Sequence, residues 1–235
     1  MNAASVDNFE ENGIAFVPGA IDTAYVKRLA DTFHTMDRRG GTRHLLDHPA
    51  VAALLGVGAM RDLIFGVLSD SAFAFKATLF DKHDKANWVV AWHRDISIPV
   101  SQRRALTGWT RWTLKEGVNY VHPPHEIMRQ IVALRINIDA CDTDDGPLRA
   151  IPGSHLLGTE KVEAKVEAAQ AATTVDFVGS AGDAWLLNPL VLHASSKTRR
   201  PTRRRVLHLE FADVELPDGL QWHRQIRFVQ QANLR

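Results

Sequence analysis

The sequence predicts a mainly β fold whose N-terminal helices pack on a β-barrel or a β-sandwich. Two patterns carry this prediction. Apolar side chains recur at helical spacing in the first third of the chain, and from residue 71 onward short strand-like stretches are separated by Gly, Pro and Asn. The length of 235 residues, with 45% hydrophobic and 23% charged residues, suits a single globular domain that buries a substantial core.

Three helices are expected in the first third of the chain. Asp22 is expected to cap the first helix, which runs through residues 24–39 and ends at a Gly-Gly pair. Its apolar residues recur at helical spacing: Tyr25, Val26, Leu29, Phe33 and Met36. The second helix follows Pro49, and the third covers residues 60–68. Residues 158–172 are a later helix candidate.

The stretches expected to form strands are short and bounded by turn residues. They cover residues 71–80, 88–95, 131–140, 173–179, 182–188 and 204–214. Residues 96–126 have little periodicity, and an irregular stretch this long inside a compact domain is typical of lids and binding loops. We therefore expect residues 96–126 to be a lid or a substrate-binding insertion over a site.

The composition narrows the classes of partner. A net charge of +1 gives no overall attraction to nucleic acid or to an anionic membrane surface, so neither is expected as a partner. No run approaches the roughly 18 apolar residues that a membrane-spanning helix needs. The single cysteine, Cys141, excludes an intrachain disulfide and suits a reducing compartment. We expect a cytoplasmic protein; the sequence specifies no oligomeric state.

A candidate metal site begins with the segment AWHRDISIPV. Residues i and i+2 of a strand point to the same face, so His93 and Asp95 are expected to project together, with Arg94 on the opposite face. His193 is the best candidate for a third ligand, because it follows another predicted strand. Two histidines and one carboxylate form the facial triad of non-haem Fe(II) oxygenases. The alternative is that Asp95 only hydrogen-bonds a core histidine.

Arg204 stands at the start of the predicted strand 204–214. A guanidinium that enters a barrel there needs an anion, and its planar shape matches a carboxylate. Two other interpretations stay open at this point. The surrounding run TRRPTRRR is also typical of a solvated basic loop, or of a segment that contacts nucleic acid.

Four motifs together resemble the phytanoyl-CoA dioxygenase family of Fe(II)/2-oxoglutarate-dependent oxygenases. They are WHRD at 92–95, DDGPLRAIPGSHLLG at 144–158, GDAWLLNPLVLHASS at 182–196 and RRVLHLEFA at 204–212. The resemblance covers roughly residues 10–213. It implies a double-stranded β-helix core (a jelly roll of the cupin kind) packed against the N-terminal helices, within a single oxygenase domain over 1–235. It also implies that His93, Asp95 and His193 hold the iron.

The resemblance further implies how the co-substrate 2-oxoglutarate binds. The family's arginine falls on Arg204, eleven residues after His193, and its preferred hydroxyl falls on Ser195. Thr78 and Arg135 are weaker matches to the same pocket, and Arg135 is expected either to add a second cation or to grip an acidic substrate. His155, in the Pro-Gly-Ser-His turn, is expected to be structural.

The implied reaction uses O2 and 2-oxoglutarate to hydroxylate, or otherwise oxidise, an unactivated C–H bond of a small-molecule metabolite, releasing succinate and CO2. Related iron halogenases lack the carboxylate ligand, so Asp95 favours hydroxylation. Candidate substrate contacts come from the expected lid: Trp109, Trp112, Lys115 and His122. Lys115 and Arg135 suggest an anionic substrate. The alternatives are a non-oxidative cupin-like metalloenzyme and a nucleic-acid binder that uses the basic run.

Overall fold

The structure is a computed structural model that describes residues 8–36, 41–157, 173–200 and 203–228. Antiparallel sheets and an N-terminal group of helices make up this part of the chain. The predicted fold class, a mainly β jelly-roll core packed against N-terminal helices, is confirmed. Among the described helices, none is long and apolar enough to cross a bilayer.

The largest sheet has six strands in the order β1-β10-β7-β12-β2-β13. These are β1 (Ile14–Val17), β10 (Ala184–Leu187), β7 (Ile131–Asn137), β12 (Arg204–Ala212), β2 (Phe73–Lys82) and β13 (Ile226–Arg227). The long strands β12 and β2 pair antiparallel, with Arg204 opposite Lys82 at one end and Ala212 opposite Phe73 at the other. This pairing fixes the register of residues that are far apart in the sequence.

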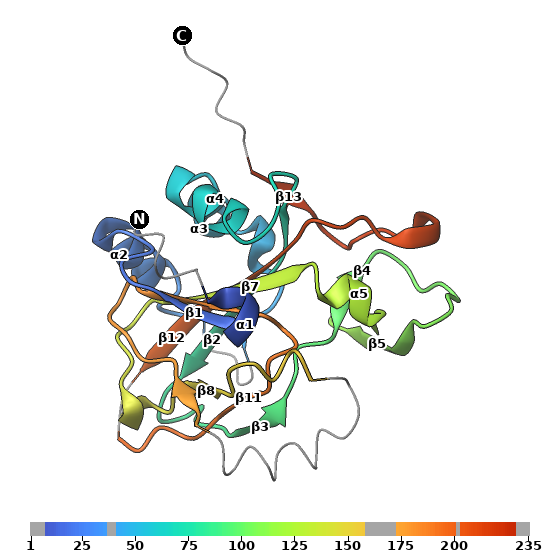
Figure 1. The fold of residues 1–235 in the computed structure, drawn as a ribbon. Helices are drawn as coiled ribbons and strands as arrows, with labels where there is room; N and C mark the ends of the chain where they lie inside the picture. The colour runs from blue at the N-terminus through green and yellow to red at the C-terminus, as the bar shows by residue number, and fades with distance from the viewer. Residues whose placement is uncertain (1–7, 37–40, 158–172, 201–202, 229–235) are drawn as a thin grey trace.

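A smaller sheet of four strands has the order β3-β11-β8-β9. Its strands are β3 (Val90–His93), β11 (His193–Ser195), β8 (Leu148–Ala150) and β9 (Val175–Asp176). Figure 1 shows this sheet on one side of β2, β7 and β12, with the helices on the other side. The two sheets therefore face each other, as the layers of a jelly roll do.

The helices that cover the large sheet are α2 (Thr23–Thr32), α3 (Pro49–Leu55) and α4 (Gly58–Phe65), preceded by the short α1 (Phe9–Asn12). Asp22 caps α2 as predicted, because its carboxylate accepts the backbone N–H of Tyr25 at 2.9 Å. The expectation that this helix continues to residue 39 is wrong at its end. Phe33 is fully buried just beyond α2, so its apolar spacing reflects core packing rather than a longer helix. The late helix candidate 158–172 lies outside the described residues.

The two faces of the large sheet differ in chemistry because side chains alternate along each strand. On β12, Leu207, Leu209 and Phe211 belong to the main hydrophobic core, together with side chains of α2, α3 and α4. The alternate positions include three buried polar residues, Arg204, His208 and Glu210. The face toward the small sheet therefore carries the charged and hydrogen-bonding groups.

Residues 96–126 are more regular than expected. They form an antiparallel sheet in the order β4-β6-β5, made of β4 (Ile98–Val100), β6 (Val118–His122) and β5 (Thr110–Lys115), and α5 (His125–Met128) follows. The expectation of an irregular stretch is corrected for a physical reason. Strand β5 is largely exposed, with Leu114 at 70% exposure, and its register with β6 shifts between Thr110 and Thr113, so no alternating pattern marks it. Short 3-10 helices cover Leu45–Asp47, Thr143–Asp145 and Pro217–Gly219.

Candidate metal centre

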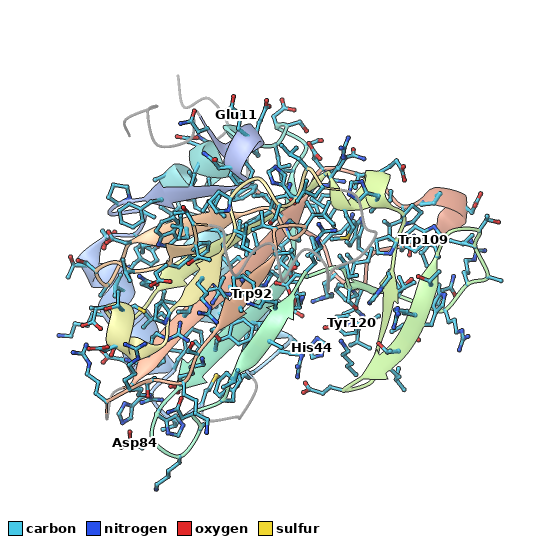
Figure 2. All side chains as sticks on the ribbon, turned by 60° about the horizontal axis from the view of Figure 1, so that its bottom comes forward. Glu11, His44, Asp84, Trp92, Trp109 and Tyr120 are labelled. Atoms are coloured by element: carbon cyan, nitrogen blue, oxygen red, sulfur yellow. The ribbon has the colours of Figure 1, made fainter. Side chains whose placement is uncertain are left out.

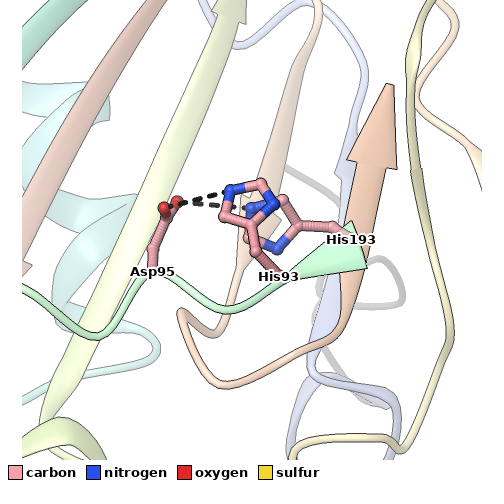
Figure 3. A group of neighbouring side chains, drawn as sticks. All are labelled: His93, Asp95 and His193. Carbon is pink, nitrogen blue, oxygen red and sulfur yellow. Dashed lines mark ion pairs between the residues drawn. The ribbon is translucent and has the colours of Figure 1, made fainter. Parts of the chain in front are cut away.

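The structure brings together His93, Asp95 and His193 (Figure 3). His93 ends β3 and His193 begins β11, and the two residues are direct partners across these strands, with ring centroids 4.2 Å apart. Asp95 lies just beyond β3, where its backbone N–H donates to the carbonyl of Pro189 at 2.9 Å. One ligand atom from each of the three side chains lies within 4.8 Å of the others. A divalent ion at the usual distance of about 2.0–2.2 Å from nitrogen and oxygen ligands fits such a group.

Both imidazoles are oriented by backbone carbonyls. The Nδ1 atom of His93 lies 2.8 Å from the carbonyl oxygen of Ala91, and that of His193 lies 2.9 Å from the carbonyl oxygen of Val191. A carbonyl oxygen only accepts, so Nδ1 carries the proton in each ring and Nε2 keeps a free lone pair. Both Nε2 atoms point toward the Asp95 carboxylate, at 3.5 Å and 3.4 Å. This arrangement fixes the tautomer that a metal ligand requires.

The charges of the three groups also suit a cation site. Burial raises the pKa of Asp95, but His193 and His93 outweigh burial and hold it well below its ordinary value. Burial lowers the pKa of His93, and its hydrogen bond and attraction to Asp95 more than offset this effect, so the pKa is raised. Asp95 therefore stays ionised at neutral pH. Because the His193 side chain is only 2% exposed while those of His93 and Asp95 are 37% and 31% exposed, the centre is open on one side.

Two adjoining cavities meet at this open side. The larger has a volume of about 650 Å³ and the smaller about 80 Å³. Both are lined by His93 and Asp95. The other walls of the smaller cavity are Phe80, Lys82, Trp88, Val90, Arg135, Leu148, His193, Ser195 and Arg204. The metal centre thus stands between a narrow, strand-walled cavity and a wide one.

Arg204 is the predicted anion-binding residue of the smaller cavity. It is 4% exposed, and burial lowers its pKa. Its Nε atom is buried and has no hydrogen-bond partner within the part of the chain that the structure describes. Burial of a guanidinium whose Nε atom has no partner is costly, and a carboxylate is the anion that its planar shape matches. The cavity therefore fits the far carboxylate of 2-oxoglutarate.

The other predicted co-substrate residues lie around Arg204. Ser195 lies on β11 and lines the smaller cavity. Arg135 is buried on β7, where it donates to Nδ1 of His208 at 3.0 Å, and burial together with Arg204 lowers its pKa to about 10. Thr78 is 3% exposed and lines the larger cavity instead, and its hydroxyl has no partner among the described residues.

Sequence reasoning missed two lysines on β2. Lys82 lies opposite Arg204 and lines the smaller cavity. Lys76 lines the larger cavity, and its Nζ atom lies 2.5 Å from the carboxylate of Glu210. Period-two spacing from Thr78 could have placed both lysines on the same face of this strand.

The predicted substrate residues separate into two groups. Lys115 and His122 line the larger cavity, together with Tyr120 of the same segment. Trp109 does not line it: the ring is 7% exposed and belongs to a hydrophobic cluster, and Trp112 packs against that cluster. In Figure 2, Trp109 lies on the three-stranded sheet away from Trp92, which lines the cavity. The placement of Trp109 and Trp112 indicates that these two rings pack in the hydrophobic cluster.

Two further expectations concern residues near the site. The Nε2 atom of His155 lies 3.0 Å from the carbonyl oxygen of Glu10, which fits the structural role expected of it. Arg94 follows His93 and donates to the backbone carbonyls of Ser154 and Leu157. Its guanidinium is thus held by the Pro-Gly-Ser-His turn, while the side chain still lines the larger cavity.

The basic run 199–205 is not a freely solvated loop where the structure describes it. Arg200 pairs with Asp142 and Asp145, Arg203 with Asp81 at 2.6 Å, and Arg205 with Asp139 at 2.7 Å. Arg199 lies 3.4 Å from Asp144. These ion pairs tie the loop to neighbouring segments of the barrel.

A jelly roll that brings two histidines and a carboxylate to one point, beside a cavity with a buried arginine, defines the class of iron- and 2-oxoglutarate-dependent oxygenases. The chain belongs to the phytanoyl-CoA dioxygenase (PhyH) family, whose sequence model matches residues 9–206. It is thus an oxygenase-type enzyme, and the predicted cofactors, iron and 2-oxoglutarate, are confirmed. No curated protein matches the chain.

Several solved structures share this fold. AviO1 from Streptomyces viridochromogenes Tue57 is 22% identical, with a TM-score of 0.66 over 92% of this chain and 97% of AviO1. HygX from Streptomyces hygroscopicus, with nickel and 2-oxoglutarate bound, is 16% identical, with a TM-score of 0.64 over 96% and 98% of the two chains. The epimerase SnoN, in complex with Fe3+, alpha ketoglutarate and nogalamycin RO, is 15% identical, with a TM-score of 0.66 over 97% and 94%.

Proposed function

We propose that the protein hydroxylates an unactivated C–H bond of a small, anionic metabolite and releases succinate and CO2 from 2-oxoglutarate. The observation that supports this most directly is the grouping of His93, Asp95 and His193 beside the unpartnered Nε atom of Arg204. A non-oxidative metal site has no need for a buried cation of this kind next to the metal ligands.

The residues of this chain have distinct parts in the proposed reaction. When bound, the iron supplies the activation of O2 and the oxidation of the C–H bond. The two Nε2 atoms and the Asp95 carboxylate hold the ion, and their carbonyl and backbone contacts keep them in place. Arg204 and Ser195 orient the far carboxylate of 2-oxoglutarate, and the strand walls of the smaller cavity exclude water from it.

Hydroxylation is the product class that Asp95 favours, because this carboxylate occupies the ligand position that related halogenases leave for halide. Purified enzyme incubated with saturating chloride should therefore give no chlorinated product, as checked by mass spectrometry. One solved structure of the same fold, SnoN, is described as an epimerase, so an epimerised or dehydrogenated product is the other result to look for.

The larger cavity carries an excess of positive charge. Its cationic lining residues are Arg43, Lys76, Arg94 and Lys115, and Asp95 is its single acidic lining residue within the described chain. Lys76 is paired with Glu210, and Arg43 lies 3.3 Å from Glu116. No described carboxylate lies within ion-pair distance of Lys115, whose Nζ atom lies 4.9 Å from the centre of the Tyr120 ring. This excess supports a carboxylate or another anionic group on the substrate.

We further propose that residues 96–126 act as the substrate-binding insertion of a single oxygenase domain. This segment lines one wall of the larger cavity through five residues: Ile96, Ser97, Lys115, Tyr120 and His122. The expectations of a cytoplasmic location and of no nucleic-acid partner stay predictions; the ion pairs of Arg203 and Arg205 remove part of the charge that nucleic-acid binding would use.

A succinate-release screen tests the proposal. The Fe(II) enzyme is incubated with 2-oxoglutarate and with pairs of candidate substrates, each carboxylic acid beside its amide. We expect stimulated succinate formation with acids, weaker stimulation with their amides, and loss of both in Arg204→Ala. Metal binding with no 2-oxoglutarate turnover in any pair would instead favour the non-oxidative cupin-like metalloenzyme.

A further inference from the structure

Lys82 is a buried ammonium group that faces the smaller cavity. It is 1% exposed, and the β2–β12 pairing places it directly opposite Arg204, which is 4% exposed. Like charges opposite each other on neighbouring strands destabilise a sheet, and each buried cation also loses its hydration. Two cations in such a pair call for an anion between them.

The groups around Lys82 do not supply that anion. Its Nζ atom donates to the backbone carbonyl of Ser196 at 2.6 Å and to Oγ of Ser195 at 3.0 Å, and it lies 5.4 Å from the centre of the Trp88 ring. The charged and titratable groups that act on it are Arg204, Arg135 and the thiol of Cys141. Among the described lining residues of the cavity, the single carboxylate is that of Asp95, which is a metal ligand.

We propose that Lys82 is a second cation for the far carboxylate of 2-oxoglutarate, acting with Arg204 from the neighbouring strand. Its hydrogen bonds to Ser195 and Ser196 hold the ammonium at the cavity wall and link it to the strand that begins with His193. The proposal rests on 2-oxoglutarate as the co-substrate and assigns Lys82 to the end of the molecule that lies away from the iron.

The proposal has a protonation signature. Burial, Arg204 and Arg135 lower the pKa of Lys82 to about 7 before any anion binds. A bound carboxylate favours the charged ammonium and raises this pKa, so binding above pH 7 draws a proton from solution. Affinity for 2-oxoglutarate is therefore expected to be constant below about pH 7 and to fall as the pH rises above it.

Calorimetric titration of the anaerobic Fe(II) enzyme tests these statements without turnover. At pH 8, in two buffers of different ionisation enthalpy, wild type should take up about 0.5–1 proton per 2-oxoglutarate bound. Lys82→Met should bind 2-oxoglutarate about 10- to 100-fold more weakly, as loss of a hydrogen bond to a charged group predicts, and should take up none. Lys82→Arg, which stays charged, should bind without the proton uptake.

A second ligand separates this role from a structural one. 2-Oxopentanoate keeps the chelating end of 2-oxoglutarate but has a methyl group in place of the far carboxylate. Wild type and Lys82→Met should bind it equally, which also shows that the variant is folded. Equal affinity of both proteins for 2-oxoglutarate, or equal weakening for both ligands in the variant, overturns the role of Lys82. Failure of wild type to bind 2-oxoglutarate at all overturns the co-substrate assignment itself.

Discussion

The smaller cavity is walled by strands of the two facing sheets, whereas the larger one is completed by the separate three-stranded sheet and by Arg43 from the chain before β2. In the smaller cavity, Arg204, Lys82 and Arg135 occupy registered positions on neighbouring strands. The larger cavity has about eight times the volume, and β5 on its outer side is largely exposed. Paired strands leave little freedom to the groups that bind metal and co-substrate. The outer wall of the larger cavity is less constrained, which leaves room for substrate specificity to vary.

Removal of a metal ligand should affect the functions of both cavities, because co-substrate binding and substrate oxidation both depend on the iron. Asp95→Ala leaves two imidazoles, and iron affinity should fall by more than the roughly 10- to 100-fold that loss of an outer hydrogen bond to a ligand causes. Turnover should fall below detection, and the visible band of the Fe(II)–2-oxoglutarate chelate should disappear. Retained turnover in this variant would contradict the assignment of Asp95.

Truncation of Trp109 should instead damage only the outer wall. The ring packs among Ile98, Val121 and Trp222, so Trp109→Ala should lower the free energy of unfolding by about 3–5 kcal/mol, as measured by urea denaturation. The 2-oxoglutarate affinity of the folded fraction should stay unchanged. Trp112→Ala is the matched control, because that ring is only partly buried and its loss should cost less. A large rise in substrate KM without a loss of stability would make Trp109 a substrate contact after all.

Arg204→Ala tests the smaller cavity alone. Loss of one partner of a buried, hydrogen-bonded charge pair typically costs about 2–5 kcal/mol, so 2-oxoglutarate should bind roughly 30- to 4000-fold more weakly. Iron binding in the absence of 2-oxoglutarate should be unaffected, because Arg204 is not a ligand. Arg204→Lys should recover part of the affinity, since it restores the charge without the planar pair of donors.

The same contrast explains what could be predicted from the sequence. The pair His93 and Asp95 was readable because the period of two is local, and Arg204 because it opens an alternating strand. Lys82 was missed because its importance comes from lying opposite Arg204, and the register between distant strands is not written in either strand alone. Strand β5 was missed because its burial does not alternate. Trp109 looked like a recognition residue because composition cannot tell a ring that packs from one that lines a cavity.

The smallest expected effect is on the anionic substrate. Lys115 is exposed on β5 and no described carboxylate pairs with it, so its attraction for a substrate anion is screened by solvent and should be worth roughly 1 kcal/mol or less. Lys115→Met should therefore raise the KM for an acidic substrate up to about fivefold, with less effect at high salt, and leave that for its amide unchanged. Lys27→Met, an exposed lysine of α2 on the other side of the large sheet, is the matched control and should change neither KM. Equal effects of Lys115→Met on the acid and the amide would show that the side chain shapes the cavity, and the substrate anion would then have to be sought at Arg43 or Lys76.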